Sequence, residues 1–155
     1  MSITRRWFMT ALFEAGWAPI TVFALHLLAS RVLRLYVAYP RTDIAMHLLG
    51  GIAIAFFFWR AGSLALHAGV IGTVNRTGMR VIIFGLTCAA AVFWECAEYL
   101  SDHYLGTNAQ LGVADTLKDM VVGIAGGVIF LASASHRRGE VPPSAHSSAL
   151  AGHRW

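Results

Sequence analysis

Most acidic residues of this chain lie in one stretch, where they interrupt two long apolar segments. Of the eight acidic residues in the chain, five lie between residues 94 and 127. Glu95, Glu98 and Asp102 are three and then four residues apart, and Asp115 and Asp119 are four apart. On a helix, these intervals place each set on one face. Because ionisable side chains are costly within apolar segments long enough to sit in lipid, this clustering indicates a functional site.

A sixth acidic residue begins another apolar segment. Asp43 lies four residues before His47, which is one helical turn. Carboxylate oxygens with one imidazole suit a hard or borderline divalent ion such as Mn, Fe, Zn, Mg or Ca. Helical bundles build carboxylate metal centres from such inward-facing residues. We therefore predict a divalent metal site, with Glu95, Glu98, Asp119 and His47 as direct ligands. The full candidate set is Asp43, His47, Glu95, Glu98, Asp102, Asp115 and Asp119.

The composition favours a membrane protein over a soluble domain. Hydrophobic residues make up 57% of the chain and charged residues 13%, whereas a soluble domain carries about 25% charged residues. The net charge of +4 comes from arginines dispersed among the ends of apolar segments. That distribution suits orientation in a membrane, so we expect contact with the lipid bilayer and no nucleic-acid binding.

We predict an all-α fold, a polytopic membrane protein built as a four-transmembrane-helix bundle. Tyr39-Pro40 should end the first span, and Thr42 should cap the second. The second helix can extend past Arg60 into further apolar residues. The transmembrane domain covers residues 1–134, and the Ser-, Pro- and His-containing residues 135–155 predict a disordered cytoplasmic tail. The expected spans are about 17–36, 43–61, 79–100 and 113–134.

Four spans bring three acidic helix ends to the same side of the membrane. These are the start of the second span, the end of the third and the start of the fourth. At a rise of about 1.5 Å per residue, Glu95 should lie roughly 10 Å deeper than Asp102. Eight basic residues fall on the opposite side and four on the acidic side, so we expect both termini in the cytoplasm and the site near the outer leaflet of a bacterial inner membrane. The eight are Arg5, Arg6, Arg60, Arg76, Arg80, Arg137, Arg138 and Arg154, and the four are Arg31, Arg34, Arg41 and Lys118.

Three functions fit these residues. A bound metal would support an enzyme acting on a lipid-linked or cell-envelope substrate, although no nucleophile is identifiable and whether the protein is an enzyme stays open. Alternatively, the four bases on the acidic side balance the acids in an ion-pair network, as in a non-catalytic scaffold or accessory subunit. The third reading is a proton or cation conductor. Gly123 and Gly127 form a GxxxG face that would let another helix approach, as in a homo-oligomer or membrane complex.

Three motifs between Thr42 and Gly127 resemble the YjdF-like branch of the VanZ-like small bacterial membrane proteins. The resemblance implies a shared fold and site, and the association of VanZ-like relatives with the cell envelope suggests envelope or lipid chemistry by analogy. The motifs are Asp43-x3-His47 with Gly50-Gly51, then Trp94-Glu95-x2-Glu98 with Tyr104 to Thr107, and finally Asp115-Thr116-x2-Asp119 with Gly123, Gly126 and Gly127.

Overall fold

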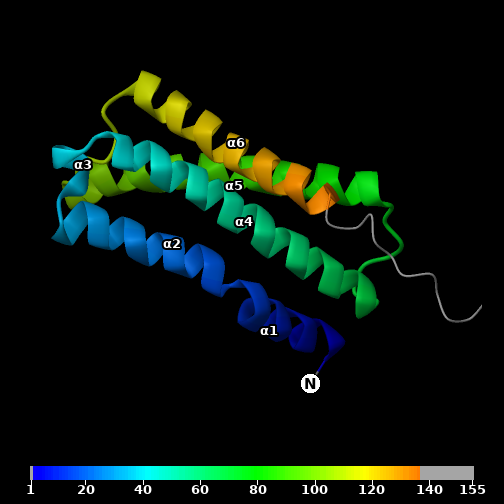
Figure 1. Ribbon diagram of the computed structural model, residues 1–155. Coiled ribbons are helices and arrows are strands. Elements are labelled where there is room, and N and C mark those ends of the chain that lie inside the picture. The colour runs from blue at the N-terminus through cyan, green and yellow to red at the C-terminus, as the bar shows by residue number, and fades with distance from the viewer. Residues whose placement is uncertain (1, 137–155) are drawn as a thin grey trace, which may run out of the picture.

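The protein is a bundle of helices, seen in a computed structural model that describes residues 2–136 (Figure 1). No strand occurs within that range. The final part of the predicted tail, residues 137–155, lies outside the described residues, whereas Ser135 and His136 still belong to the last helix. The helices are α1 (Ile3–Ala15), α2 (Trp17–Leu27), the π-helical turn η1 (Leu28–Val32), α3 (Leu35–Ala38), α4 (Arg41–His67), α5 (Arg76–Leu105) and α6 (Val113–His136).

Three helices are long and apolar enough to cross a membrane, namely α4, α5 and residues Val113–Ala134 of α6. The segments Ile3–Ala15 and Trp17–Val32 are bent by 51° and together can form a fourth span. Large apolar side chains point outward from these helices, among them Phe93 at 72% and Val121 at 66% exposure. Lipid is the solvent that such a surface requires. The predicted all-α polytopic bundle is confirmed.

The first span is built differently from the prediction. A single helix was expected over residues 17–36, but the helix that begins at Trp17 passes into a π-helical turn and ends at Val32. Arg34 then adopts a left-handed conformation with φ 51°, which is uncommon for a residue other than glycine. The chain therefore turns before Tyr36, which lies in the separate short helix α3.

The ends of α4 also differ from the expected ones. Pro40 occupies the N-cap position, no side chain caps the helix, and Thr42 lies inside its first turn. The predicted Thr42 cap is wrong because the helix begins at Arg41, directly after the proline, whose fixed φ is compatible with a helix start. At the other end, α4 continues to His67, as the apolar residues after Arg60 suggested.

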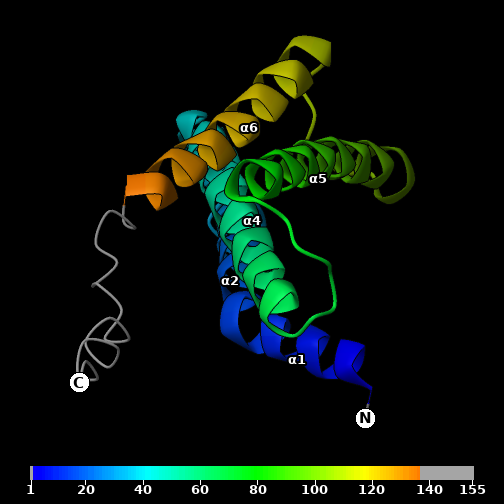
Figure 2. The same ribbon diagram turned by 90° about the vertical axis from the view of Figure 1, so that its right-hand side faces the viewer.

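The helix α4 is the central element, and α6, α5 and the α1–α2 pair are arranged around it (Figure 2). It approaches α6 so closely that a Cβ added to Gly51 would lie 1.8 Å from the carbonyl oxygen of Gly123. A Cβ on Gly126 would likewise lie 2.2 Å from the carbonyl oxygen of Leu48. Glycine is required at this crossing, since any side chain would push the two backbones apart.

The GxxxG face of α6 is used inside the chain. Gly123 faces the backbone of α4, and a Cβ on Gly127 would lie 2.6 Å from the Thr87 side chain of α5. A second copy cannot pack on a face that α4 and α5 already cover. The expected homo-oligomer or membrane complex through Gly123 and Gly127 is therefore corrected by the packing of the chain itself.

The apolar core lies deeper than the acidic helix ends. Ala55, Met79, Ile83 and Leu131 are buried together, with aromatic side chains such as Phe58 packed on them. Ala55 follows His47 by eight residues, and Leu131 follows Asp119 by twelve. A rise of about 1.5 Å per residue places this layer roughly 12–18 Å from the acidic cluster. The bundle thus has a polar end and an apolar end.

At the apolar end, a hydrogen bond and an ion pair connect α1 to α4. The indole Nε1 of Trp7 donates a hydrogen bond to the carbonyl oxygen of Ala61 at 2.8 Å. Glu14, which interrupts the apolar residues of the first segment, forms an ion pair with Arg60 of α4. Both side chains of that pair are more than a third exposed, so solvent screens the interaction and its contribution to stability is small.

Candidate metal centre

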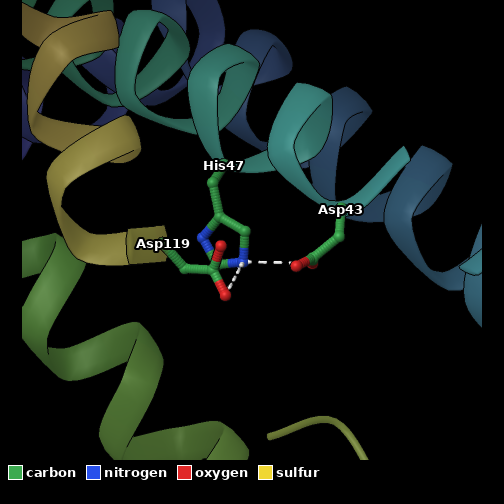
Figure 3. A group of neighbouring side chains, drawn as sticks. All are labelled: Asp43, His47 and Asp119. Carbon is green, nitrogen blue, oxygen red and sulfur yellow. Dashed lines mark ion pairs between the residues drawn. The ribbon is translucent and has the colours of Figure 1, made fainter. Parts of the chain in front are cut away.

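His47 of α4 lies at the centre of the acidic cluster (Figure 3). Its Nε2 atom is 3.3 Å from Oδ1 of Asp43, one turn earlier on α4, and 3.9 Å from Oδ2 of Asp119 on α6. Its Nδ1 atom is 3.7 Å from Oε1 of Glu95 on α5. Three helices that are distant in sequence therefore direct carboxylates at one imidazole.

Two groups of three side chains have the spacing of metal ligands. In each group, one ligand atom per residue lies within 4.8 Å of the others. The first group is Asp43, His47 and Asp119, and the second is His47, Glu95 and Glu98. The imidazole is shared: Asp43 and Asp119 lie on its Nε2 side, and Glu95 lies on its Nδ1 side.

The deepest carboxylates are not fully hydrogen-bonded. The side chains of Glu95 and Asp119 are 5% and 4% exposed. Within the described part of the chain, Glu95 Oε1 and Asp119 Oδ1 are buried and accept no hydrogen bond. A buried carboxylate oxygen without a donor costs several kcal/mol. The Lys118 ammonium, 3.4 Å from Asp119 Oδ1, lowers that cost for Asp119, and a further donor or cation beside each oxygen would remove the rest.

Other groups fix the glutamates in place. Gln110, from the loop between α5 and α6, donates from Nε2 to the Glu95 carbonyl oxygen at 2.9 Å and to Glu95 Oε2 at 3.2 Å. The indole of Trp94 donates to Glu98 Oε1 at 2.9 Å. These contacts satisfy one oxygen of each glutamate, and they leave Glu95 Oε1 directed at His47.

Lys118 is the one lysine or arginine within the described residues that pairs with this cluster. Its Nζ atom lies 3.4 Å from Asp119 Oδ1 and 3.9 Å from Asp43 Oδ2, and it also binds Asp115. Its side chain is 41% exposed, so it lies at the rim. Even with His47 protonated, the two bases face five carboxylates, namely Asp43, Glu95, Glu98, Asp115 and Asp119.

The three arginines expected to balance the acids do not pair with them. Arg31, Arg34 and Arg41 form no ion pair with any carboxylate of residues 2–136. If all five carboxylates were ionised, three negative charges would stay uncompensated. The charge balance of the site is therefore incomplete without a further cation or bound protons.

Asp102 and Asp115 lie outside both three-residue groups. Asp102 accepts hydrogen bonds from the backbone N–H groups of Ala109 at 2.8 Å and Gln110 at 2.9 Å, and from the Thr107 hydroxyl. Asp115 accepts the backbone N–H of Leu111 at 3.4 Å and pairs with Lys118. Both carboxylates hold the loop between α5 and α6, and that loop in turn carries Gln110 to Glu95.

His26 of α2 and Tyr36 of α3, which the sequence analysis did not assign to the site, lie in contact beside it. Nδ1 of His26 lies 2.8 Å from the Tyr36 hydroxyl, although His26 had no evident partner in the sequence. The His26 ring meets the Trp94 ring edge to face, with centroids 5.2 Å apart. Burial, followed by the negative charge of Asp43, raises the pKa of Tyr36 above its usual value. Its hydroxyl therefore loses its proton at a higher pH than that of an ordinary tyrosine.

Two cavities adjoin the cluster, and His26 lines both. The first, of about 420 Å³, is here called the polar cavity because Asp43, Glu98, Arg31 and Lys118 line it, together with residues of the α5–α6 loop. The second, of about 250 Å³, is lined mainly by apolar residues of α2, α4 and α5, with Gly123 from α6; the polar groups of its lining belong to His26, His47, Thr87 and Trp94. His47 lies in the wall of the apolar cavity and Asp43 in the wall of the polar one.

Apolar helices around a buried carboxylate–histidine cluster define a multi-pass membrane protein. A family model described as "Predicted membrane protein (DUF2238)" matches residues 2–140, and the chain belongs to this family. The YjdF-like part of the resemblance is confirmed, since the YjdF family is this one. No curated protein and no solved structure matches the chain significantly.

Proposed function

We propose that this protein binds one divalent metal ion through Asp43, Nε2 of His47 and Asp119. The observation that carries the proposal is the convergence of Asp43 Oδ1 and Asp119 Oδ2 on Nε2 of His47. The second oxygen of Asp119 is buried without a hydrogen bond within the described residues. Metal–ligand distances of about 2.0–2.2 Å set ligand atoms roughly 3–3.5 Å apart. The separations of 3.3 Å and 3.9 Å from Nε2 need only small side-chain rotations to reach that range.

Glu95 would act on the other nitrogen of the same ring. A metal-bound histidine commonly donates its second N–H to a carboxylate, which fixes the tautomer and the ring orientation. Glu95 Oε1 is the carboxylate atom on the Nδ1 side. One imidazole among carboxylates favours Mn, Fe or Zn over Mg and Ca, which prefer all-oxygen sites.

A metal at this depth suits chemistry on a lipid-linked or cell-envelope substrate. It would polarise a phosphoryl or carbonyl oxygen and lower the pKa of a bound water, which is the basis of metal-assisted hydrolysis. The resemblance to VanZ-like proteins, with their link to the cell envelope, supports this by analogy. We place the protein in a bacterial inner membrane with both termini cytoplasmic, because Arg5, Arg6, Arg60 and Arg76 lie at the end of the bundle away from the cluster.

The two alternatives fit the geometry less well. A scaffold held by ion pairs needs the four bases near the acids to pair with them, and within the described chain Lys118 is the one of the four that does so. A proton or cation conductor needs polar groups across the membrane. Below the cluster, however, the bundle is filled by the layer of Ala55, Ile83 and Leu131.

Elemental analysis of the full-length protein tests the proposal. The wild type, purified in detergent after growth with Mn, Fe and Zn, should hold about one metal ion per chain, and His47→Ala and Asp119→Asn should lose it. Asp115→Asn is the matched control, since it removes the same charge one turn from Asp119 but outside both ligand groups. A wild type without metal, or a metal content equal in all four proteins, would show the proposal to be wrong.

A further inference from the structure

The two cavities beside the cluster differ in polarity and in depth. The polar cavity is lined by α3 and by Thr107, Asn108 and Ala109 of the α5–α6 loop, so it lies at the helix ends. The apolar cavity is lined by Val22 and by Ile54 and Ala90, which lie seven residues after His47 and five before Glu95. At about 1.5 Å per residue, these positions are roughly 8–10 Å deeper in the bundle. The change from polar to apolar follows the direction from headgroup to hydrocarbon in a bilayer.

The polar cavity contains donors that nothing in the described chain satisfies. Arg31 lines it and forms no hydrogen bond or close ion pair within residues 2–136, although its charge acts on Asp102 from a longer distance. Ser30 lines it as well, and its buried Oγ has no hydrogen-bond partner within the same residues. A guanidinium and a hydroxyl beside a metal site are the groups that bind phosphate oxygens.

The apolar cavity is large enough for part of a hydrocarbon chain. Its volume is about 250 Å³, whereas an apolar cavity of about 150 Å³ already takes up benzene. It is partly open, and it lies between α2 and α5, which both pack on α4 and meet each other through Phe23, His26 and Trp94. An unfilled cavity of this size loses packing contacts on all sides. Lipid chains are the apolar molecules at hand around a transmembrane helix.

We infer that the two cavities together hold one bilayer lipid with a phosphate headgroup. Its phosphate lies in the polar cavity between Arg31 and the metal, and the first part of one hydrocarbon chain lies in the apolar cavity beneath His47. The inference rests on the proposed function, because without a metal the phosphate would meet only partly compensated carboxylates. It also makes the lipid the substrate class, with its phosphate oxygens at the metal.

Native mass spectrometry of the full-length protein in detergent tests this inference in the metal-loaded and chelator-treated states. The probes are dioleoyl phosphatidic acid, which has a bare phosphate headgroup, and dioleoylglycerol, which has the same chains and no phosphate. We expect phosphatidic acid to bind at least about tenfold more tightly than dioleoylglycerol, and only when metal is present, because a charge-assisted hydrogen bond contributes about tenfold or more to affinity.

Two kinds of variant separate the headgroup from the chain. Arg31→Gln should weaken phosphatidic acid binding about tenfold, with Arg76→Gln at the other end of the bundle as its control. Ala90→Phe and Val22→Phe each fill the apolar cavity and should weaken binding of the same probe. Val81→Phe adds the same ring at a position of α5 that is 64% exposed to lipid, and it should bind like the wild type. The metal content of every variant is measured alongside.

The outcomes are distinguishable. Stoichiometric metal with equal binding of the two lipids, or with phosphatidic acid binding unchanged in Arg31→Gln and in both cavity-filling variants, overturns the lipid inference and leaves the metal proposal standing. A wild type without metal overturns the proposed function and the metal-dependent lipid site with it. If one cavity-filling variant loses its metal, the other, on a different helix, decides the outcome.

Discussion

Replacing Gly51 with alanine perturbs the contact that sets the distance between α4 and α6. The added Cβ would lie 1.8 Å from the carbonyl oxygen of Gly123 and 2.7 Å from its carbonyl carbon, whereas real Cβ atoms essentially never come closer than 3.0 Å. The obstacle is helix backbone, so it cannot rotate out of the way. The two helices must separate by more than about 1 Å, and overpacking of this kind costs about 1–3 kcal/mol of unfolding free energy.

The same displacement should weaken metal binding. Gly51 follows His47 by four residues on α4, and Gly123 follows Asp119 by four on α6. Nε2 of His47 and Oδ2 of Asp119 are already 3.9 Å apart. Two atoms that bind one metal at about 2.1 Å cannot be more than about 4.2 Å apart. An added separation of about 1 Å exceeds that limit, so we expect metal affinity to fall about tenfold or more.

Gly50→Ala is the control, since a Cβ on Gly50 meets nothing within 4 Å. It should be neutral or stabilising by up to about 1 kcal/mol through helix propensity. Thermal unfolding in detergent, followed by circular dichroism, compares the stabilities, and calorimetric titration with the metal that the wild type retains compares the affinities. Equal melting temperatures and equal affinities in Gly51→Ala and Gly50→Ala would refute the reasoning.

Two further predictions concern residues around the site. Asp102→Asn should weaken the hydrogen bonds from the N–H groups of Ala109 and Gln110 by about 1 kcal/mol. Amide hydrogen exchange should therefore be faster over residues 106–112 than in the wild type. Exchange as slow as in a Glu14→Gln control would contradict the role of Asp102 in the loop. Because burial raises the pKa of Tyr36, the unfolded chain loses this proton near pH 10 while the folded protein keeps it, so folding stability should fall as the pH rises above about 10. The Tyr36→Phe variant should not show this fall in folding stability. Parallel stability–pH curves for the wild type and the variant between pH 8 and 11 would contradict the raised pKa of Tyr36.

The three long helices could be predicted because the sequence marks both their interiors and their ends. Long apolar segments lie between Tyr39-Pro40, the turn around Asn75 and the polar loop that follows Leu105. The first span could not be predicted in the same way. Its π-helical turn and the left-handed Arg34 accompany the contact between His26 and Tyr36, and such a contact across a turn leaves no periodic pattern in the sequence.

The convergence of the acidic residues could also be predicted. Which of them lie near His47 and which bind the α5–α6 loop could not. Spacing alone placed Asp102 and Asp115 with the other candidates, because both satisfy helical periodicity. Their carboxylates instead accept hydrogen bonds from backbone N–H groups of the α5–α6 loop. Helical spacing does not predict the conformation of that loop. For the same reason Gln110 was missed, and Asp43 lies nearer to Nε2 of His47 than the acids expected as direct ligands.

The inward faces of the three long helices follow one order, from charged residues to small ones and then to the apolar layer. On each helix neighbouring members of the series are four apart, so each lies on nearly the same face as the next. The small residues therefore lie one turn beneath the candidate ligands, and they let the backbones approach. Larger residues there would hold the helices at the usual interaxial distance of about 8–10 Å, and the carboxylates would not reach one imidazole. The glycines are thus as much a part of the site as the acids. The three series are Asp43, His47, Gly51 and Ala55 on α4, Glu95, Ala91, Thr87 and Ile83 on α5, and Asp115, Asp119, Gly123, Gly127 and Leu131 on α6.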